Sequence, residues 1–132
     1  KCQTKLCKQF EKTKLQGIHI HCPEGAVPKD GPSAGTAITV AIYSLLNKKK
    51  IKNNIAITGE INLQGKVSAI GGLELKILGG LKAGIKTFIY PEDNQKDYLK
   101  FIEKYENKNI ISDDITFINV SDIKTVLNIV FV

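Results

Sequence analysis

The sequence predicts an α/β fold of the mixed α+β kind, in which a mixed sheet is flanked by helices. Apolar residues in 33–47 and 72–83 recur at helical spacing, whereas 54–59 and 85–90 are short runs typical of strands. Helical and strand-like segments alternate along the chain, which is typical of sheets covered by helices. The length of 132 residues suits one core, so we expect a single domain over 1–132.

The first part of the chain leads from a polar segment into a turn region. Residues 1–16 are lysine-rich without a clear period, and we expect a surface segment there. Residues 17–21 alternate between apolar and polar side chains, which predicts a strand. Residues 22–32 are rich in Pro and Gly, which predicts a loop. The helix over 33–47 has few polar residues, so we expect it to be largely buried.

The remaining elements are expected from periodicity, turn residues and caps. In order, they are a hairpin over 60–70, a helix over 72–83, a strand over 85–90, a helix over 95–105, a strand over 115–120 and a helix over 122–130. Gln64 and Gly65 mark the turn of the hairpin, and Gly84 is suited to end the first of these helices. Asn94 and Ser121 are expected to be the N-caps of the last two helices.

The composition argues against several classes of function. The 19 basic residues are all lysines, and the net charge is +6. Basic charge can indicate a nucleic-acid partner, but bidentate contacts to bases and phosphates come mainly from Arg. No apolar run reaches the roughly 20 residues that span a bilayer, so no membrane association is expected. The three cysteines form no CxxC pair, and their odd count favours a reducing compartment.

The segment around Ser33 is the first candidate for catalysis. Gly31, Ser33 and Gly35 satisfy G-x-S-x-G, a pattern that presents a serine hydroxyl at a turn before a helix. Free N–H groups and the positive dipole end of a helix suit a developing oxyanion. Because Pro32 has no N–H, the donors would come from Ser33, Ala34 or their neighbours. The alternative is that Ser33 is only a helix cap, which so short a pattern cannot exclude.

The serine needs a base, and no histidine follows Ser33 in the chain. An α/β-hydrolase arrangement therefore fails, because its His comes after its Ser. His19 and His21 share one face if they lie on a strand, so a His, Asp, Ser order with Asp30 stays open. Together with Cys22 they could form part of a zinc site, but no further ligand follows at a recognisable spacing. We therefore expect no metal.

Lys76 is the other candidate base. Ser-x-x-Lys does not occur at Ser33, so a lysine base must come from a distant segment. The neighbours of Lys76 on a helix over 72–83 would all be small or apolar. They are Gly72, Leu73, Gly79 and Gly80. We expect such a face to pack closely and exclude water, which favours the neutral amine that a general base needs. The alternative, on these residues alone, is that Lys76 is an ordinary helical lysine.

Three blocks occur in order along the chain. They are His19-Ile20-His21 with Pro28-Lys29-Asp30-Gly31-Pro32-Ser33-Ala34-Gly35, then Thr58-Gly59-Glu60-Ile61 with Gly71-Gly72-Leu73 and Lys76, then Gly84-Ile85-Lys86-Thr87 with Pro91-Glu92 and Asn94. They resemble the nucleophile motif, the base motif and a third block of the peptidase domain of Lon proteases. The resemblance runs from about Ile18 to the C-terminus, and 1–16 match weakly. Cys22 and the pair Glu74-Leu75 depart from the family pattern.

This resemblance implies both a fold and an activity. The family fold is a Lon-type peptidase domain of mixed α/β structure that assembles into a homo-hexamer. The implied activity is that of an ATP-dependent serine endopeptidase that degrades unfolded or damaged proteins. Ser33 would be the nucleophile and Lys76 the general base. Thr58 would orient Lys76 by a hydrogen bond, and Asp30 and His21 would line the site.

The resemblance also implies partners beyond this segment. In the family an ATPase module that uses ATP and Mg²⁺ normally precedes the peptidase domain. This chain has no G-x-x-x-x-G-K-[ST], so we expect that module and an upstream part of the domain to lie elsewhere. No cofactor is expected in the domain itself. Because Lon proteins can bind DNA, a nucleic-acid-binding module stays open as a rival, as does a Lon-like scaffold without peptidase activity.

The C-terminal segment favours one compartment. Its ending, which includes Phe117, Val120 and 128–131, looks closer to mitochondrial family members than to bacterial ones. We therefore expect the mitochondrial matrix, with a bacterial cytoplasm or another organelle as the alternative.

Overall fold

The computed structural model describes residues 4–21 and 31–132. Its centre is a three-stranded sheet in the order β1-β4-β5. The strands are β1 (Ile55–Ile57), β4 (Thr87–Pro91) and β5 (Thr116–Val120), and both pairings are parallel. Such neighbours need crossover connections, and two helices supply them here.

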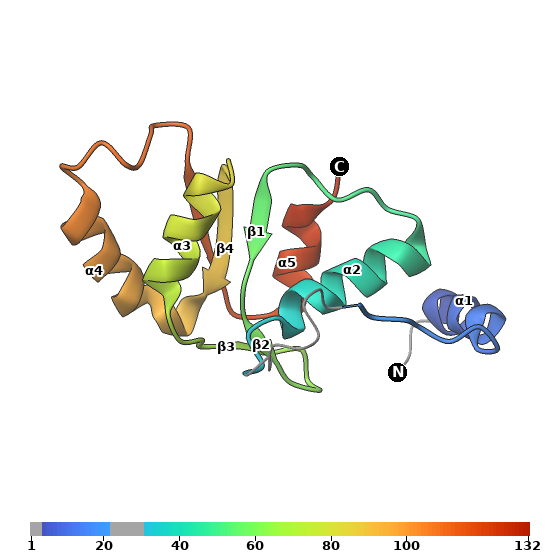
Figure 1. Ribbon diagram of the computed structural model, residues 1–132. Helices are drawn as coiled ribbons and strands as arrows, with labels where there is room; N and C mark the ends of the chain where they lie inside the picture. The colour runs from blue at the N-terminus through green and yellow to red at the C-terminus, as the bar shows by residue number, and fades with distance from the viewer. Residues whose placement is uncertain (1–3, 22–30) are drawn as a thin grey trace.

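Helices cover both faces of this sheet (Figure 1). They are α2 (Gly35–Asn47), α3 (Leu73–Lys82), α4 (Gln95–Tyr105) and α5 (Ile123–Val130). Helix α1 (Thr4–Thr13) lies apart from the sheet, next to α2. Helices α3 and α4 lie on one side of the sheet, and α2 and α5 lie on the other. A separate antiparallel hairpin joins β2 (Glu60–Ile61) to β3 (Val67–Ser68), and a 3₁₀ turn, η1 (Glu92–Asn94), precedes α4. The predicted mixed α/β class is confirmed.

The sheet divides the apolar core into two clusters, because successive side chains of β4 point to opposite faces. Phe88 and Tyr90 face α3 and α4, whereas Ile89 faces α2 and α5. The first cluster also contains Leu73, Ile77 and Phe101, and the second contains Val40, Val67, Val120, Val126 and Val130. Each face of the sheet therefore holds its own helix pair in place.

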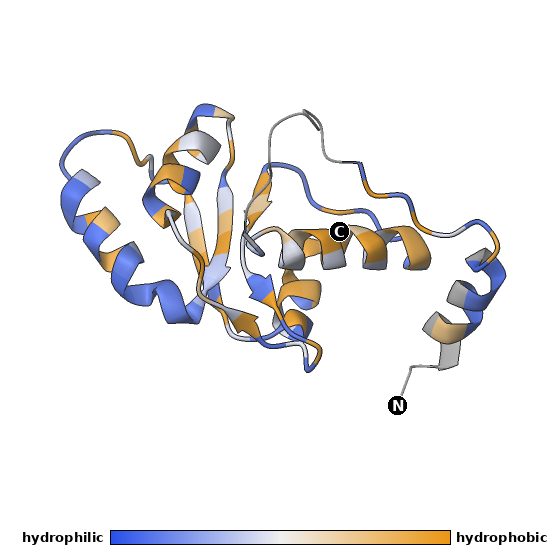
Figure 2. Cartoon of the chain, turned by 60° about the horizontal axis from the view of Figure 1, so that its bottom comes forward, coloured by the Kyte–Doolittle hydropathy of each residue, from blue (hydrophilic) through white to orange (hydrophobic). Residues whose placement is uncertain are grey.

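Helix α2 is present where the sequence predicts a helix, but it is not largely buried. Within α2, which the structure describes in full, Thr36 and Val40 are buried and Leu45 is 69% exposed. Figure 2 shows apolar colouring along much of this helix. An apolar sequence gives the capacity for burial, but burial also needs a partner on each face. The sheet and α5 cover one face, which is why the prediction was wrong.

One prediction for the N-terminal segment is also wrong, and one helix was not predicted. Residues 4–13 form a helix, α1, in the lysine-rich segment for which the sequence predicted only a surface location. Residues 17–21 form no strand, and Ile18 and Ile20 are 40% and 54% exposed. An alternating pattern defines the two faces of a strand, but a strand also needs a neighbouring edge to pair with. Cys7 in α1 is disulfide-bonded.

Of the two predicted N-caps, Asn94 lies at the expected position and Ser121 does not. Asp122 rather than Ser121 caps α5, and its carboxylate accepts a hydrogen bond from the N–H of Thr125 at 2.9 Å. Asn94 precedes α4 as expected but makes no capping bond. Its side chain, which is buried, instead forms two bonds with the backbone of Ile70. The sequence identifies a side chain that can form a capping hydrogen bond. The tertiary structure decides which partner that side chain bonds to.

We predict opposite effects for alanine at two adjacent glycines of α3. A Cβ at Gly80 would overlap Cε1 of the buried Phe88, whereas a Cβ at Gly79 meets nothing within 4 Å. Gly80→Ala should therefore lower the free energy of unfolding by about 1–3 kcal/mol through overpacking. Gly79→Ala should raise it by about 0.5–1 kcal/mol, because alanine favours a helix. Urea denaturation of both variants measures this, and equal effects would contradict the packing argument.

Candidate active site

Ser33 lies in the turn that leads into α2. The turn is closed by a hydrogen bond from the N–H of Gly35 to the carbonyl of Pro32 at 3.0 Å. Gly31 adopts a φ of +90°, which glycine reaches without strain. The residue at the N-cap position is Ala34, and no side chain caps the helix. The interpretation of Ser33 as a mere cap is therefore not what the structure shows.

The side chain of Ser33 contacts Lys76 of α3. The Nζ atom of Lys76 lies 3.2 Å from the Oγ atom of Ser33, within hydrogen-bond distance, although the two residues are 43 positions apart. Ser33 is half-buried. The two residues are held by opposite faces of the sheet, because α2 packs into one core cluster and α3 into the other. The structure thus brings together the nucleophile and the base that the sequence predicts.

The end of β1 is bonded to the start of α2. The N–H of Gly59 donates to the carbonyl of Ser33 at 3.0 Å, and the carbonyl of Gly59 accepts from the N–H and hydroxyl of Thr36 at 3.1 and 2.9 Å. A Cβ at Gly59 would lie 2.6 Å from Cγ1 of Val67 and 2.8 Å from Oγ1 of Thr36. The close approach therefore requires glycine. Sequence reasoning gave Thr36 no role.

Thr58 takes part in this connection, but its partner differs from the expected one. Its hydroxyl donates to the carbonyl of Ser33 at 3.4 Å and not to Lys76. This is a long hydrogen bond, so it contributes less than the 3.0 Å bond of Gly59 beside it. Thr58 thus supports the backbone of Ser33 rather than the amine of Lys76. The sequence predicted that the Thr58 hydroxyl lies at the end of a strand. The path of the backbone after that strand decides which group the hydroxyl reaches.

Asn94 holds the loop that precedes α3 by bonding to the backbone of Ile70. Its amide accepts from the N–H of Ile70 and donates to the carbonyl of Ile70, both at 2.9 Å, and it also donates to Asp97 at 2.8 Å. Asn94 is 2% exposed, so these bonds satisfy a buried amide that would otherwise be costly. The loop leads through Gly71 and Gly72 into α3, which carries Lys76. Asn94 is thus a second residue whose role in the site the sequence did not reveal.

Two cavities meet at Ser33 and Lys76. One has a volume of about 250 Å³, and its other lining is mainly apolar, including Ala34, Ala37, Ile57, Leu73 and Ile77. The second has a volume of about 360 Å³ and is lined by Gly31, Pro32, Glu60, Ala69, Ile70 and Gly71 in addition to the pair. An extended chain segment could therefore approach the hydroxyl, and an apolar side chain could enter the first cavity.

The expected dry surroundings of Lys76 are not found in this chain. Lys76 is exposed, as are Gly72 and Gly79, and a Cβ at either glycine would meet nothing within 4 Å. Gly80 does pack closely, but against Phe88 of the sheet. Small neighbours permit close packing without supplying a second surface, so the prediction of a dry face was wrong for the described residues.

The remaining predicted site residues lie apart from the pair or outside the described residues. His21 is exposed and stacks on His19, with ring centroids 6.4 Å apart, and it lines neither of the two cavities at Ser33. Asp30 and Cys22 are outside the described residues. Within 4–21 and 31–132, no group of three or more His, Cys, Asp or Glu side chains could hold a metal ion. No helix of those residues is long and apolar enough to cross a membrane.

The fold and site define a mixed α/β domain with a serine and a lysine in contact at the start of a helix. A family model described as the Lon protease (S16) C-terminal proteolytic domain matches residues 1–132. The chain belongs to this family, as the resemblance predicts.

Several curated relatives, all named Lon protease, agree with this assignment. The chain is 48% identical over 120 residues to that of Clostridium acetobutylicum, which covers 91% of this chain and 14% of the relative. It is 59% identical over 90 residues to the Lon protease of Fusobacterium nucleatum, and this match covers 68% of this chain and 12% of the relative. It is 46% identical over 122 residues to the Lon protease of Metamycoplasma arthritidis, and this match covers 92% of this chain and 14% of the relative. The chain thus corresponds to a small part of each relative. These organisms are bacteria, which gives no support to the expected mitochondrial location.

We predict that the hydroxyl of Thr36 contributes to stability. Thr36→Val removes the 2.9 Å bond to the carbonyl of Gly59 at a fully buried position, so the free energy of unfolding should fall by about 1 kcal/mol. Thr39→Val is the matched control, because that hydroxyl only bonds back to Gly35 within the same helix. Thermal unfolding of both variants measures the difference. A larger loss in Thr39→Val would count against the role assigned to Thr36.

Proposed function

We propose that this chain is the catalytic part of an ATP-dependent serine endopeptidase that degrades unfolded or damaged proteins. The observation that carries the proposal is the 3.2 Å contact between Nζ of Lys76 and Oγ of Ser33. A serine hydroxyl is a weak nucleophile unless a base takes its proton. In the described residues, Lys76 is the titratable side chain within hydrogen-bond distance of Ser33. Membership of the Lon family supports the same assignment.

In the proposed reaction, Ser33 and Lys76 act in both steps, acylation of the serine and hydrolysis of the resulting ester. Ser33 Oγ attacks the carbonyl carbon of the scissile peptide bond while the neutral amine of Lys76 takes the hydroxyl proton. The same amine, now charged, returns that proton to the leaving nitrogen, and an acyl-enzyme ester on Ser33 remains. Water then attacks the ester with Lys76 again acting as the base, which releases the acid product and restores the serine. The observed separation suits transfer in either direction.

Backbone N–H groups beside Ser33 support stabilisation of the oxyanion. Within the described residues, the N–H groups of Ser33 and Ala34 donate to no backbone carbonyl. They precede the first turn of α2, where the helix dipole favours negative charge. We propose that these groups are the donors to the tetrahedral intermediate.

The exposure of Lys76 to solvent leads to a proposal about assembly and ATP. Lys76 is exposed here, yet a lysine acts as a base only when its charged form is disfavoured. We propose that a homo-hexamer encloses the site and excludes water from Lys76. An ATPase module that binds ATP and Mg²⁺ would unfold the substrates and deliver them. The bacterial relatives favour a bacterial cytoplasm over the mitochondrial matrix as the location.

We predict that Ser33→Ala and Lys76→Ala will each lower ATP-stimulated cleavage of an unfolded protein by about 10³-fold or more, because residues that act as a unit fail together. The assay uses the intact natural polypeptide that carries this chain. Lys82→Ala is the matched control, since Lys82 is an exposed lysine of the same helix, and it should cleave normally.

The pattern of losses tests each role separately. If Lys76→Ala cleaves at the wild-type rate, another group is the base. If neither Ser33→Ala nor Lys76→Ala has an effect, the domain is a scaffold and the proposed peptidase activity is wrong. Thermal unfolding and ATP hydrolysis of the variants should match the wild type, which separates loss of chemistry from loss of fold.

A further inference from the structure

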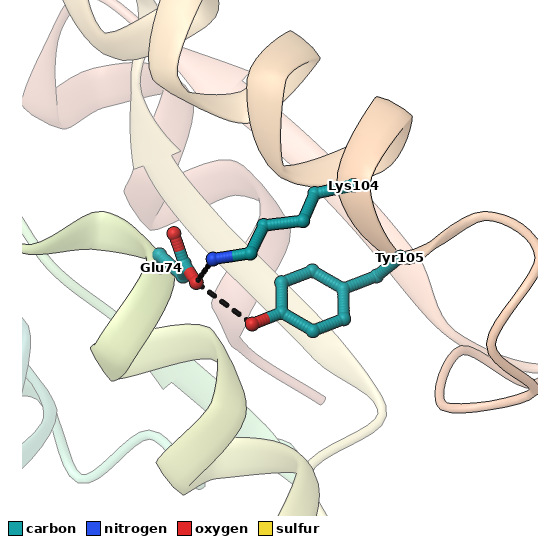
Figure 3. A network of polar contacts seen from close by, with 3 residues as sticks. All are labelled: Glu74, Lys104 and Tyr105. Carbon is teal, nitrogen blue, oxygen red and sulfur yellow. Dashed lines mark hydrogen bonds and ion pairs between the residues drawn. The ribbon is translucent and has the colours of Figure 1, made fainter.

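Glu74 joins α3 to α4 through two hydrogen bonds. Its Oε1 atom accepts from Nζ of Lys104 at 2.7 Å and from the hydroxyl of Tyr105 at 2.7 Å. Figure 3 shows both donors reaching across from α4 to this one oxygen. These bonds hold the pKa of the Glu74 carboxyl below its ordinary value, with the Lys104 bond as the largest cause. The carboxylate is therefore the form that the contact stabilises.

One of the two donors, Tyr105, is itself held in place on α4. The ring of Tyr105 packs against that of Phe101, with centroids 4.9 Å apart, and Phe101 is 1% exposed. The ammonium groups of Lys104 and Lys108 lie 5.3 and 5.5 Å from the centroid of Tyr105. An isolated surface ion pair contributes little, because two long side chains must be ordered to form it. Here one donor is a ring that the core already orders.

Glu74 and Lys76 lie on opposite flanks of α3. Leu73 and Ile77 are the buried residues of this helix and form its contact with the core. Consecutive residues are about 100° apart around a helix, so Glu74 and Lys76 are roughly 160° apart, with the buried stripe between them. A rotation of α3 about this stripe would move the amine of Lys76 and the carboxylate of Glu74 together. Bonds that fix one flank therefore also fix the other.

We infer that Glu74 is a positioning residue, which sets the rotation of α3 and so holds the amine of Lys76 within reach of Ser33. This inference rests on the proposed function, because it concerns the same Ser33–Lys76 pair.

The test compares Glu74→Ala with Glu74→Gln in the intact natural polypeptide. The readout is the rate at which Ser33 is acylated by a fluorophosphonate probe, together with kcat and KM for a peptide substrate. Glu74→Ala should lower the acylation rate and kcat by about tenfold or more, because small displacements of a reacting group are costly, while KM stays within about twofold. Glu74→Gln keeps an oxygen acceptor and should restore most of the rate.

The control is Asp114→Ala, which removes the other ion pair of the described residues, between Lys86 and Asp114 at 2.7 Å. It should leave the acylation rate unchanged. Tyr105→Phe should cause a smaller loss than Glu74→Ala, and the double variant should be no worse than Glu74→Ala alone, because both changes remove the same contact.

The outcomes separate this inference from the proposed function. If wild-type Ser33 reacts with the probe and Glu74→Ala reacts equally fast, the positioning role is wrong and the peptidase proposal is unaffected. The positioning role is also wrong if Glu74→Gln is as slow as Glu74→Ala, or if both lose rate only in step with lost thermal stability. If wild-type Ser33 does not react and no peptide is cleaved, the proposed function fails, and this inference fails with it.

Discussion

The candidate site depends on the close approach of the end of β1 to the start of α2. At Gly59 there is no room for a side chain between Val67 and Thr36. The peptide groups on either side of this glycine hold Ser33 and Thr36 by hydrogen bonds of about the ordinary length. The position of the serine is therefore set by the sheet, through backbone groups, before any contact with Lys76 is considered.

The lysine is positioned independently, from the opposite face of the sheet. Helix α3 packs through Leu73 and Ile77 into the cluster of Phe88 and Tyr90, whereas α2 belongs to the other cluster. The two residues meet just beyond the carboxyl end of β1, where open α/β sheets commonly bind ligands. Both helices pack on the same sheet. The contact between Ser33 and Lys76 therefore needs no direct packing of α2 on α3. Small adjustments of either helix then change the separation of the pair.

The sequence predicted helices α2 to α5 and strands β1 to β5 from local periodicity and turn residues, whereas the pairing of Ser33 with Lys76 came from the resemblance of several motifs to the Lon family. It did not predict the partners of Thr58 and Asn94. Each residue type shows what its side chain can bond, but both partners come from segments far away in the sequence, at Ser33 and Ile70. The error at 17–21 has a similar origin, since a strand is completed by an edge that its own sequence does not describe. Local patterns therefore predicted elements better than they predicted contacts.

Contact geometry and exclusion of solvent are separate requirements of a serine–lysine pair, and this chain meets the first without the second. The 3.2 Å contact between Ser33 and Lys76 exists in the single chain, yet water reaches the lysine across the open faces of Gly72 and Gly79. A charged amine gives up its hydration only when another surface replaces the water around it. Glycines at these positions leave room for such a surface to approach the backbone closely. In the proposed ring, assembly would then complete the surroundings of Lys76, and a chain outside the ring would keep the contact between Ser33 and Lys76 without that enclosing surface.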